Sequence, residues 1–141
     1  MSTLALDTNV LLYVLLNHPQ FGAPAASLLQ GAYGHLQASE LVIPELLGHE
    51  SIRNDAERRQ VDGFVQSQLF TLQPIDRAVL YRAAELRRTY TVSLADALHL
   101  ASCLVHQATH FITNDQELLK HAIPDILLVN LADAAQLLLQ L

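Results

Sequence analysis

Short apolar segments alternate with longer helical stretches along the whole chain, and this alternation restricts the fold more than any other feature of the sequence. Five segments are typical of strands: 4–6, 35–38, 70–72, 111–113 and 127–129. The signal is weakest for 35–38. Periodicity and capping signals predict helices near 9–16, 23–31, 45–53, 55–69, 76–90, 94–107, 115–121 and 131–140. Strands that alternate with helices pair in parallel. We therefore expect an α/β fold, with a mostly parallel central sheet of about five strands and helices on both of its faces.

The size and composition of the chain suit one packed domain. It has 141 residues, of which 51% are hydrophobic, so we expect a single domain over residues 1–141. The longest apolar run, 10–16, is much shorter than the roughly 20 residues of a membrane span, and no basic segment precedes it as in a secretion signal. The single cysteine, Cys103, cannot form an internal disulfide. These features predict a cytoplasmic protein that does not cross a membrane.

Four carboxylates, Asp7, Glu45, Asp96 and Asp115, stand where a predicted strand gives way to a helix or a helix begins. Each has a structural explanation, because Asp and Glu are favoured in first helical turns, and Ser93 with Asp96 has the spacing of a capping box. Together they indicate more, because helices of a parallel sheet begin at the carboxyl edge of the strands, where ligands bind. Carboxylates that converge there repel one another unless a hard cation such as Mg²⁺ or Mn²⁺ lies between them.

The distribution of basic residues bears on the partner. The net charge of −6 argues against a nucleic-acid partner. However, seven of the eight basic residues are arginines between positions 53 and 88, where only five acids lie, so this stretch carries +2 and the rest −8. No Lys or Arg lies within five residues of Asp7, Glu45 or Asp96. The chain can therefore present arginines to an anionic polymer while it gathers carboxylates elsewhere.

Pro44 leaves one helix boundary open. It can be the first residue of a helix, or it can kink a helix that begins at Ser39. In both cases Glu45 lies in an early helical turn.

Four short motifs in order along the chain carry a resemblance to a known family. They are Leu6-Asp7-Thr8-Asn9, Ser39-x-x-Val42-x-x-Glu45-Leu46-Leu47, the run ADALHLA over 95–101, and Thr113-Asn114-Asp115. Steps of 38, 51 and 19 residues separate the successive acids. The chain resembles a PIN-domain ribonuclease, and most of all the small VapC-like toxins of type II toxin–antitoxin systems. The resemblance covers nearly the whole chain and implies a single-domain PIN-like fold.

This resemblance implies a metal-dependent endoribonuclease that hydrolyses RNA phosphodiester bonds. One or two Mg²⁺ or Mn²⁺ ions would activate water and stabilise the leaving oxygen. The implied catalytic residues, which are also the implied metal ligands, are Asp7, Glu45, Asp96 and Asp115. The resemblance further implies a homodimer that a cognate antitoxin holds inactive by covering the acidic groove.

Further residues match supporting positions of the family. Asn9 and Thr113 match positions that support the acids by hydrogen bonding, and they are equally suited to a helix cap and a strand end. Glu117 is a candidate auxiliary acid or a solvated helix residue. The candidate RNA contacts are Arg53, Arg58, Arg59, Arg82, Arg87 and Arg88. As solvated helix faces, these arginines would include a local pair between Glu85 and Arg88.

Apolar helices leave the oligomeric state open. The predicted helices 9–16 and 131–140 suit either a dimer surface or an ordinary core. Leu137, Leu138, Leu139 and Leu141 form an almost all-round apolar end that the protein itself or a second copy must cover.

Other functions are weaker alternatives. A carboxylate–metal site also suits a DNA nuclease or a phosphatase, and a non-catalytic interaction module could keep the fold and work through a partner surface. Asp96, His99, Cys103 and His106 do not form a zinc site, because they extend over about 15 Å of one helix, on the side away from its apolar face. The sequence has no nucleophile elbow, Walker loop or dinucleotide fingerprint.

Overall fold

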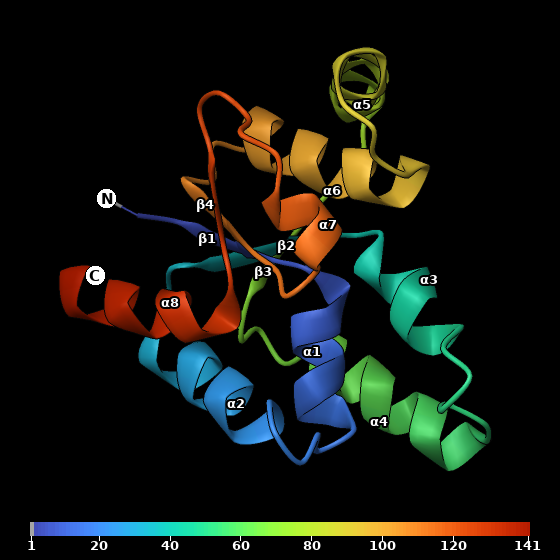
Figure 1. Ribbon diagram of the computed structural model, residues 1–141. Helices are drawn as coiled ribbons and strands as arrows, with labels where there is room; N and C mark the ends of the chain where they lie inside the picture. Colours follow the sequence, from blue (N-terminus) through green and yellow to red (C-terminus); the bar gives the residue numbers. More distant parts are fainter. Residues whose placement is uncertain (1) are drawn as a thin grey trace.

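The computed structural model describes residues 2–141 as a parallel sheet of five strands between two layers of helices (Figure 1). The strands are β1 (Leu4–Leu6), β2 (Leu36–Ser39), β3 (Thr71–Gln73), β4 (His110–Ile112) and β5 (Leu127–Val129). They lie in the order β3-β2-β1-β4-β5, and every neighbouring pair is parallel. The predicted α/β class and parallel sheet are therefore confirmed.

Polar residues at the helix starts decide where most of the helices begin. The helices are α1 (Thr8–Leu15), α2 (Gly22–Gly31), α3 (Val42–Leu47), α4 (Asp55–Val65), α5 (Arg77–Thr89), α6 (Leu94–Val105), α7 (Gln116–Leu119) and α8 (Leu131–Leu137), and a 3-10 turn follows at Leu138–Gln140. At the start of six helices, a side-chain oxygen accepts a hydrogen bond from a free backbone N–H of the first turn. The residues that supply this oxygen are Asp7, Asn54, Asp76, Ser93, Asp115 and Asn130.

The sheet separates two apolar cores, because successive side chains of a strand point to opposite faces. Leu4 and Leu6 of β1 pack with α1, α2, α3, α4 and α8, whereas Ala5 between them packs with α5, α6 and α7. In Figure 1, α1, α2 and α8 lie on one side of the sheet and α5 and α6 on the other. β1 is wholly buried at the centre of the sheet, so whatever follows it is held firmly.

Helix α3 begins earlier than predicted, and both sequence interpretations of Pro44 were wrong. The prediction was 45–53, but the helix covers Val42–Leu47, and Ser39 ends β2. Pro44 is the third helical residue, where its missing N–H costs nothing because the first turn has no internal acceptor. Glu45 does lie in the first turn, as expected. After the helix, Gly48 lies so close to the Pro44 carbonyl that an added Cβ would be 2.7 Å from its oxygen, so this turn requires glycine.

The ends of two other predicted helices differ for packing reasons. The predicted helix 55–69 ends at Val65, because the chain turns at Gln68, with φ of 65°, and brings Phe70 into the core. The predicted helix 131–140 becomes 3-10 at Leu138, whose side chain lies against Gly31 of α2. Leu137, Leu138 and Leu141 pack on the core, so the chain itself covers most of its apolar end. Within residues 2–141, no helix has the length and apolar character to cross a membrane.

A pair of leucines tests this packing. Leu46→Ala is expected to lower the free energy of unfolding by about 3 kcal/mol, because Leu46 is fully buried in the core that holds α3. Leu139→Ala makes the same chemical change at a side chain that is 91% exposed, and it should leave stability within about 0.5 kcal/mol of the wild type. Urea unfolding of the two variants measures the difference. Equal losses would contradict the core assignment.

Candidate active site

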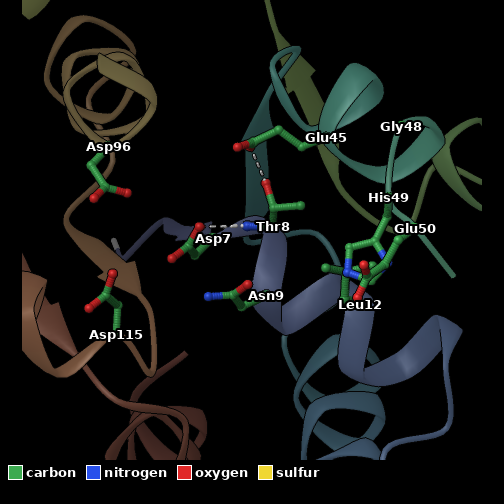
Figure 2. Close-up of a pocket in the computed structure, with 10 residues that line it drawn as sticks. All are labelled: Asp7, Thr8, Asn9, Leu12, Glu45, Gly48, His49, Glu50, Asp96 and Asp115. Atoms are coloured by element: carbon green, nitrogen blue, oxygen red, sulfur yellow. Dashed lines mark hydrogen bonds between the residues drawn. The ribbon is translucent and has the colours of Figure 1, made fainter. Parts of the chain in front are cut away.

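The carboxyl edge of the sheet carries an open pocket of about 470 Å³, between α1, α3 and the starts of α6 and α7 (Figure 2). It lies beside the point where the strand order reverses around β1, which is the ligand-binding position of open parallel sheets. The residues that line it are Asp7, Thr8, Asn9, Leu12, Glu45, Gly48, His49, Glu50, Asp96 and Asp115. All four predicted acids therefore lie around one pocket. Their roles as ligands or catalysts stay predictions.

Asp7 lies deepest, directly after the central strand β1. Its side chain is only 6% exposed and caps α1, with Oδ1 accepting from the Thr8 N–H at 2.8 Å. Oδ2 accepts from the hydroxyl of Thr113 at 2.7 Å. Burial raises the pKa of Asp7, and the hydrogen bond from Thr113 offsets this only in part. The carboxylate is thus held firmly in place, but its negative charge is not fully compensated by its surroundings.

Thr113 links Asp7 to a second acid. It follows β4 directly and is fully buried. Its hydroxyl donates to Asp7, and the same Oγ1 accepts from the Asp115 N–H at 3.1 Å. Asp115 in turn caps α7 through Oδ1, which accepts from the N–H groups of Glu117 and Leu118. Because β1 and β4 are neighbours in the sheet, the two acids that follow them lie on adjacent strand ends.

Asp96 enters the pocket from the first turn of α6. The Ser93 hydroxyl caps this helix by accepting the Asp96 N–H at 3.1 Å, so the capping expected for Ser93 is confirmed. Partial burial raises the pKa of Asp96, and the negative charges of Asp115 and Glu45 raise it further. Like charges therefore act on one another across this pocket.

Glu45 is held differently from the other acids. Its Oε1 accepts from the Thr8 hydroxyl at 2.6 Å and from Nε2 of His99 at 2.6 Å. Partial burial acts to raise the pKa of Glu45, but the hydrogen bonds from His99 and Thr8 outweigh it and hold the pKa below its usual value. Figure 2 shows the carboxylate pointing toward the space between Asp7 and Asp96.

The pocket has the donor chemistry of a hard cation site. Among the part of the chain that the structure describes, no Lys or Arg lines it, although five carboxylates do. Within the same part, no three His, Cys, Asp or Glu side chains are arranged closely enough to hold an ion by themselves. Oxygen ligands that leave space between them suit Mg²⁺, which keeps several of its waters. A divalent cation therefore fits these residues if water completes its coordination.

The other predicted residues divide between the pocket and the surface. Asn9 lines the pocket, and Asp7 rather than Asn9 caps α1. Glu117 lies outside the pocket lining and pairs with Lys120 at 2.9 Å on the surface.

Five of the six candidate arginines lie on α4 and α5, which flank the site because α4 packs on α3 and α5 packs on α6, and Arg53 lies between α3 and α4. Two of them form exposed ion pairs, Arg58 with Asp55 and Arg82 with Glu85. The expected local pair of Glu85 with Arg88 was wrong, because Arg82 takes this partner. Arg87 and Arg88 lie in the last turn of α5.

Sequence reasoning missed two contributors to the site. His99 and Cys103 were expected on the polar side of α6, but they are 2% and 1% exposed. His99 faces Ser39 of β2 and Phe111 of β4, because α6 packs on the sheet with this side. Glu50 lines the pocket from the turn after α3, at a position that the predicted helix 45–53 had included. The signal for His99 was its place one turn after Asp96, within the ADALHLA motif.

The PIN domain family matches residues 4–124, which include all four acids. The chain belongs to the PIN domain family. No curated protein matches it significantly. The family resemblance seen in the motifs is thus confirmed over most of the chain.

Several solved structures share this PIN fold. A chain of a toxin–antitoxin complex from Klebsiella pneumoniae has a TM-score of 0.68 and 23% identity, over 89% of this chain and 96% of that one. A chain of VapBC2 from Rickettsia felis, bound to promoter DNA, has a TM-score of 0.71 and 19% identity, over 91% and 98%. FitAcB from Neisseria gonorrhoeae has a TM-score of 0.70 and 23% identity, over 92% and 99%. At these identities the likeness concerns the fold.

Neutralising Asp7 is expected to make the PIN domain more stable while it removes a charge from the pocket. Because burial raises the pKa of Asp7, the folded state keeps this proton to a higher pH than the unfolded chain. The wild type therefore loses stability as the pH rises from about 4, the unfolded pKa, through the folded pKa. In EDTA at pH 7, Asp7→Asn should melt about 2–5 °C higher.

Thermal unfolding across pH in EDTA measures this effect. Asp133→Asn, which neutralises an exposed acid in α8, is the matched control and should bring no gain. A lower melting temperature for Asp7→Asn at pH 7 would contradict an uncompensated buried charge.

Proposed function

We propose that this PIN domain is a metal-dependent endoribonuclease, the toxin of a toxin–antitoxin pair. The observation that carries the proposal is the acidic pocket: four carboxylates from different elements reach one pocket without a lining Lys or Arg among the described residues. Such an arrangement costs stability in the absence of a cation, and a protein that retains it needs it for binding or catalysis. Membership of the PIN family supports a nuclease over other metal-dependent activities.

The residues that would hold the cation are Asp7, Glu45, Asp96 and Asp115, partly through water. When bound, a divalent ion such as Mg²⁺ or Mn²⁺ lowers the pKa of a coordinated water and stabilises negative charge on the phosphate. Asp7 is the fixed point of the set, because both of its oxygens are hydrogen-bonded. Asn9 and Thr113 are proposed to support the acids, and Thr113 already contacts two of them.

Arginines on both flanks of the acidic pocket are suited to hold a polyanion. Arg53 follows α3, while the others lie on α4 and α5, the helices that pack on α3 and α6. A phosphate chain that crosses the pocket can then be neutralised on either side, while the scissile phosphate meets the acids. This arrangement favours a polymer over a phosphomonoester, and RNA is the substrate that the family resemblance implies.

A cognate antitoxin is the proposed protein partner. The structures that share the fold include chains from toxin–antitoxin complexes. The acidic pocket is open, so a partner segment with basic side chains can cover it and supply the missing positive charge. A homodimer and a cytoplasmic location are also proposed, on the resemblance to VapC-like toxins.

The direct test is cleavage of a mixed RNA pool by the purified protein with Mg²⁺, with Mn²⁺ or with EDTA. We expect cleavage with metal and none in EDTA. Asp7→Asn and Asp96→Asn should each lower the rate by at least about 100-fold, since each removes a charge that holds the ion. Asp133→Asn should cleave like the wild type, because Asp133 lies away from the pocket.

Single-stranded DNA and a phosphomonoester serve as alternative substrates in the same assay. Preference for either over RNA would replace the ribonuclease proposal with the corresponding activity. No hydrolysis of any substrate by folded wild type that binds Mn²⁺ would leave a non-catalytic interaction module.

The arginines are tested through the salt dependence of RNA binding. In Arg87→Gln/Arg88→Gln, we expect weaker binding and a slope of log affinity against log salt that is shallower by about 1.4, because single strands lose about 0.7 per lost phosphate contact. The double variant Arg58→Gln/Arg59→Gln tests the arginines of α4 in the same way, with the same expected changes in affinity and slope. The rate at saturating RNA should stay unchanged in both. An unchanged slope would return these arginines to solvated helix faces.

A further inference from the structure

A buried histidine lies behind the acidic pocket, within hydrogen-bonding distance of Glu45. His99 is 2% exposed on α6, and its two ring nitrogens contact residues from other elements. Nε2 lies 2.6 Å from Oε1 of Glu45 in α3, and Nδ1 lies 2.9 Å from Oγ of Ser39 at the end of β2. The imidazole thus joins the β2 strand end to a carboxylate of the pocket.

The donors and acceptors of this chain can be assigned from chemistry. A carboxylate oxygen only accepts, so the contact with Glu45 requires a proton on Nε2 of His99. Where the ring is neutral, Nδ1 accepts and the Ser39 hydroxyl donates to it. Oγ of Ser39 in turn accepts from the Leu41 N–H at 3.3 Å. In this form the ring nitrogens and the Ser39 hydroxyl all have partners.

A packing role alone does not explain a histidine at this position. Apart from the ring of Phe111, the side chains that His99 contacts are polar: Thr8, Ser39 and Glu45, and an apolar replacement would leave them without this partner. Burying an imidazole costs free energy that only its hydrogen bonds recover. Its contacts with Ser39, with Glu45 and, at 3.3 Å from Nε2, with the Thr8 hydroxyl all lie at the carboxyl edge of the sheet, beside the pocket.

Glu45 needs such a support because it is the most mobile kind of acid in the set. Glutamate has one more rotatable bond than aspartate, and Glu45 keeps 34% of its side chain exposed. Both of its hydrogen bonds, from Thr8 and from His99, converge on the single oxygen Oε1. The second oxygen therefore stays available to the pocket.

We propose that His99 is the positioning residue of Glu45: Ser39 orients the imidazole, and the imidazole holds Oε1 so that the other carboxylate oxygen faces the cation and substrate. The inference rests on the proposed function, since it assigns a task within that site. It adds two residues, Ser39 and His99, that act on the chemistry through Glu45 without touching substrate.

Two variants of His99 separate positioning from packing. His99→Gln keeps an N–H donor at about the reach of Nε2, whereas His99→Asn reaches only as far as Nδ1 and loses the bond to Glu45. We expect His99→Asn to lower kcat and Mn²⁺ affinity by about 10–100-fold with little change in KM for RNA, and His99→Gln to restore most of both. Ser39→Ala, which frees the ring, should fall between them.

Two readouts do not depend on activity. Two-bond ¹H–¹⁵N correlation spectra should show Nε2 of His99 protonated and Nδ1 not. ¹³C relaxation of the Glu45 side chain should give a lower order parameter in His99→Asn than in the wild type, and His99→Gln should restore it. The opposite tautomer, or equal Glu45 order in all three proteins, would overturn the proposal.

The outcomes distinguish this proposal from the proposed function. If the wild type cleaves RNA and both His99 variants cleave equally well per folded molecule, positioning by His99 is wrong and the nuclease stands. If the wild type neither cleaves RNA nor binds Mn²⁺, the proposed nuclease function is wrong. The tautomer of His99 and the order parameters of Glu45 then still test whether His99 positions Glu45. Equal losses in His99→Asn and His99→Gln, matched by equal losses of stability, would reduce His99 to a core residue.

Discussion

The carboxylate of Asp7, held at the end of the central strand, is the interaction on which the rest of the site depends. It closes the first turn of α1 through the Thr8 N–H and ties β1 to the end of β4 through Thr113. Thr113 passes the constraint to Asp115, and Thr8 passes it to Glu45. Three of the four acids are therefore positioned through one small network. Its anchor is rigid because β1 is buried on both faces between two cores.

The same network explains why the pocket is costly to the folded chain. The parallel strand ends bring acids together, burial removes water from Asp7, and neighbouring charges act on Asp96. Glu45 escapes this effect, because Thr8 and His99 donate to it. The site thus contains one acid stabilised as an anion by the protein and two whose negative charge the fold disfavours. This imbalance is what a cation, or a basic segment of a partner, would relieve.

The arginines illustrate how the fold uses an uneven charge distribution. They cluster in the sequence between positions 53 and 88, yet α4 and α5 carry all but Arg53 to opposite faces of the sheet. Both helices flank a helix that bears a pocket acid. A protein of net charge −6 can therefore offer positive side chains on two sides of an acidic centre, which total charge alone would not suggest.

Much of this architecture follows from local sequence. Apolar runs of three or four residues mark the strands, and polar residues such as Ser93 and Asp115 mark the helix starts, because these preferences act within a few bonds. The placement of four acids at helix starts, together with parallel pairing, predicted their convergence. Pro44 misled because a proline is tolerated at any of the first helical positions, so it does not define a single start.

The sequence by itself determined the strands, most helix starts, the parallel sheet and the edge at which the acids meet. Only the tertiary structure decided which side chains form hydrogen bonds with these acids. His99 is buried because this side of α6 packs on β2 and β4, and its partners Glu45 and Ser39 lie 54 and 60 residues away in sequence. The family motif marked Thr113 as a support of the acids, but only the tertiary structure shows that its partner is Asp7, 106 residues distant. Hydrogen bonds between such distant residues depend on how whole layers pack, and no local pattern encodes that.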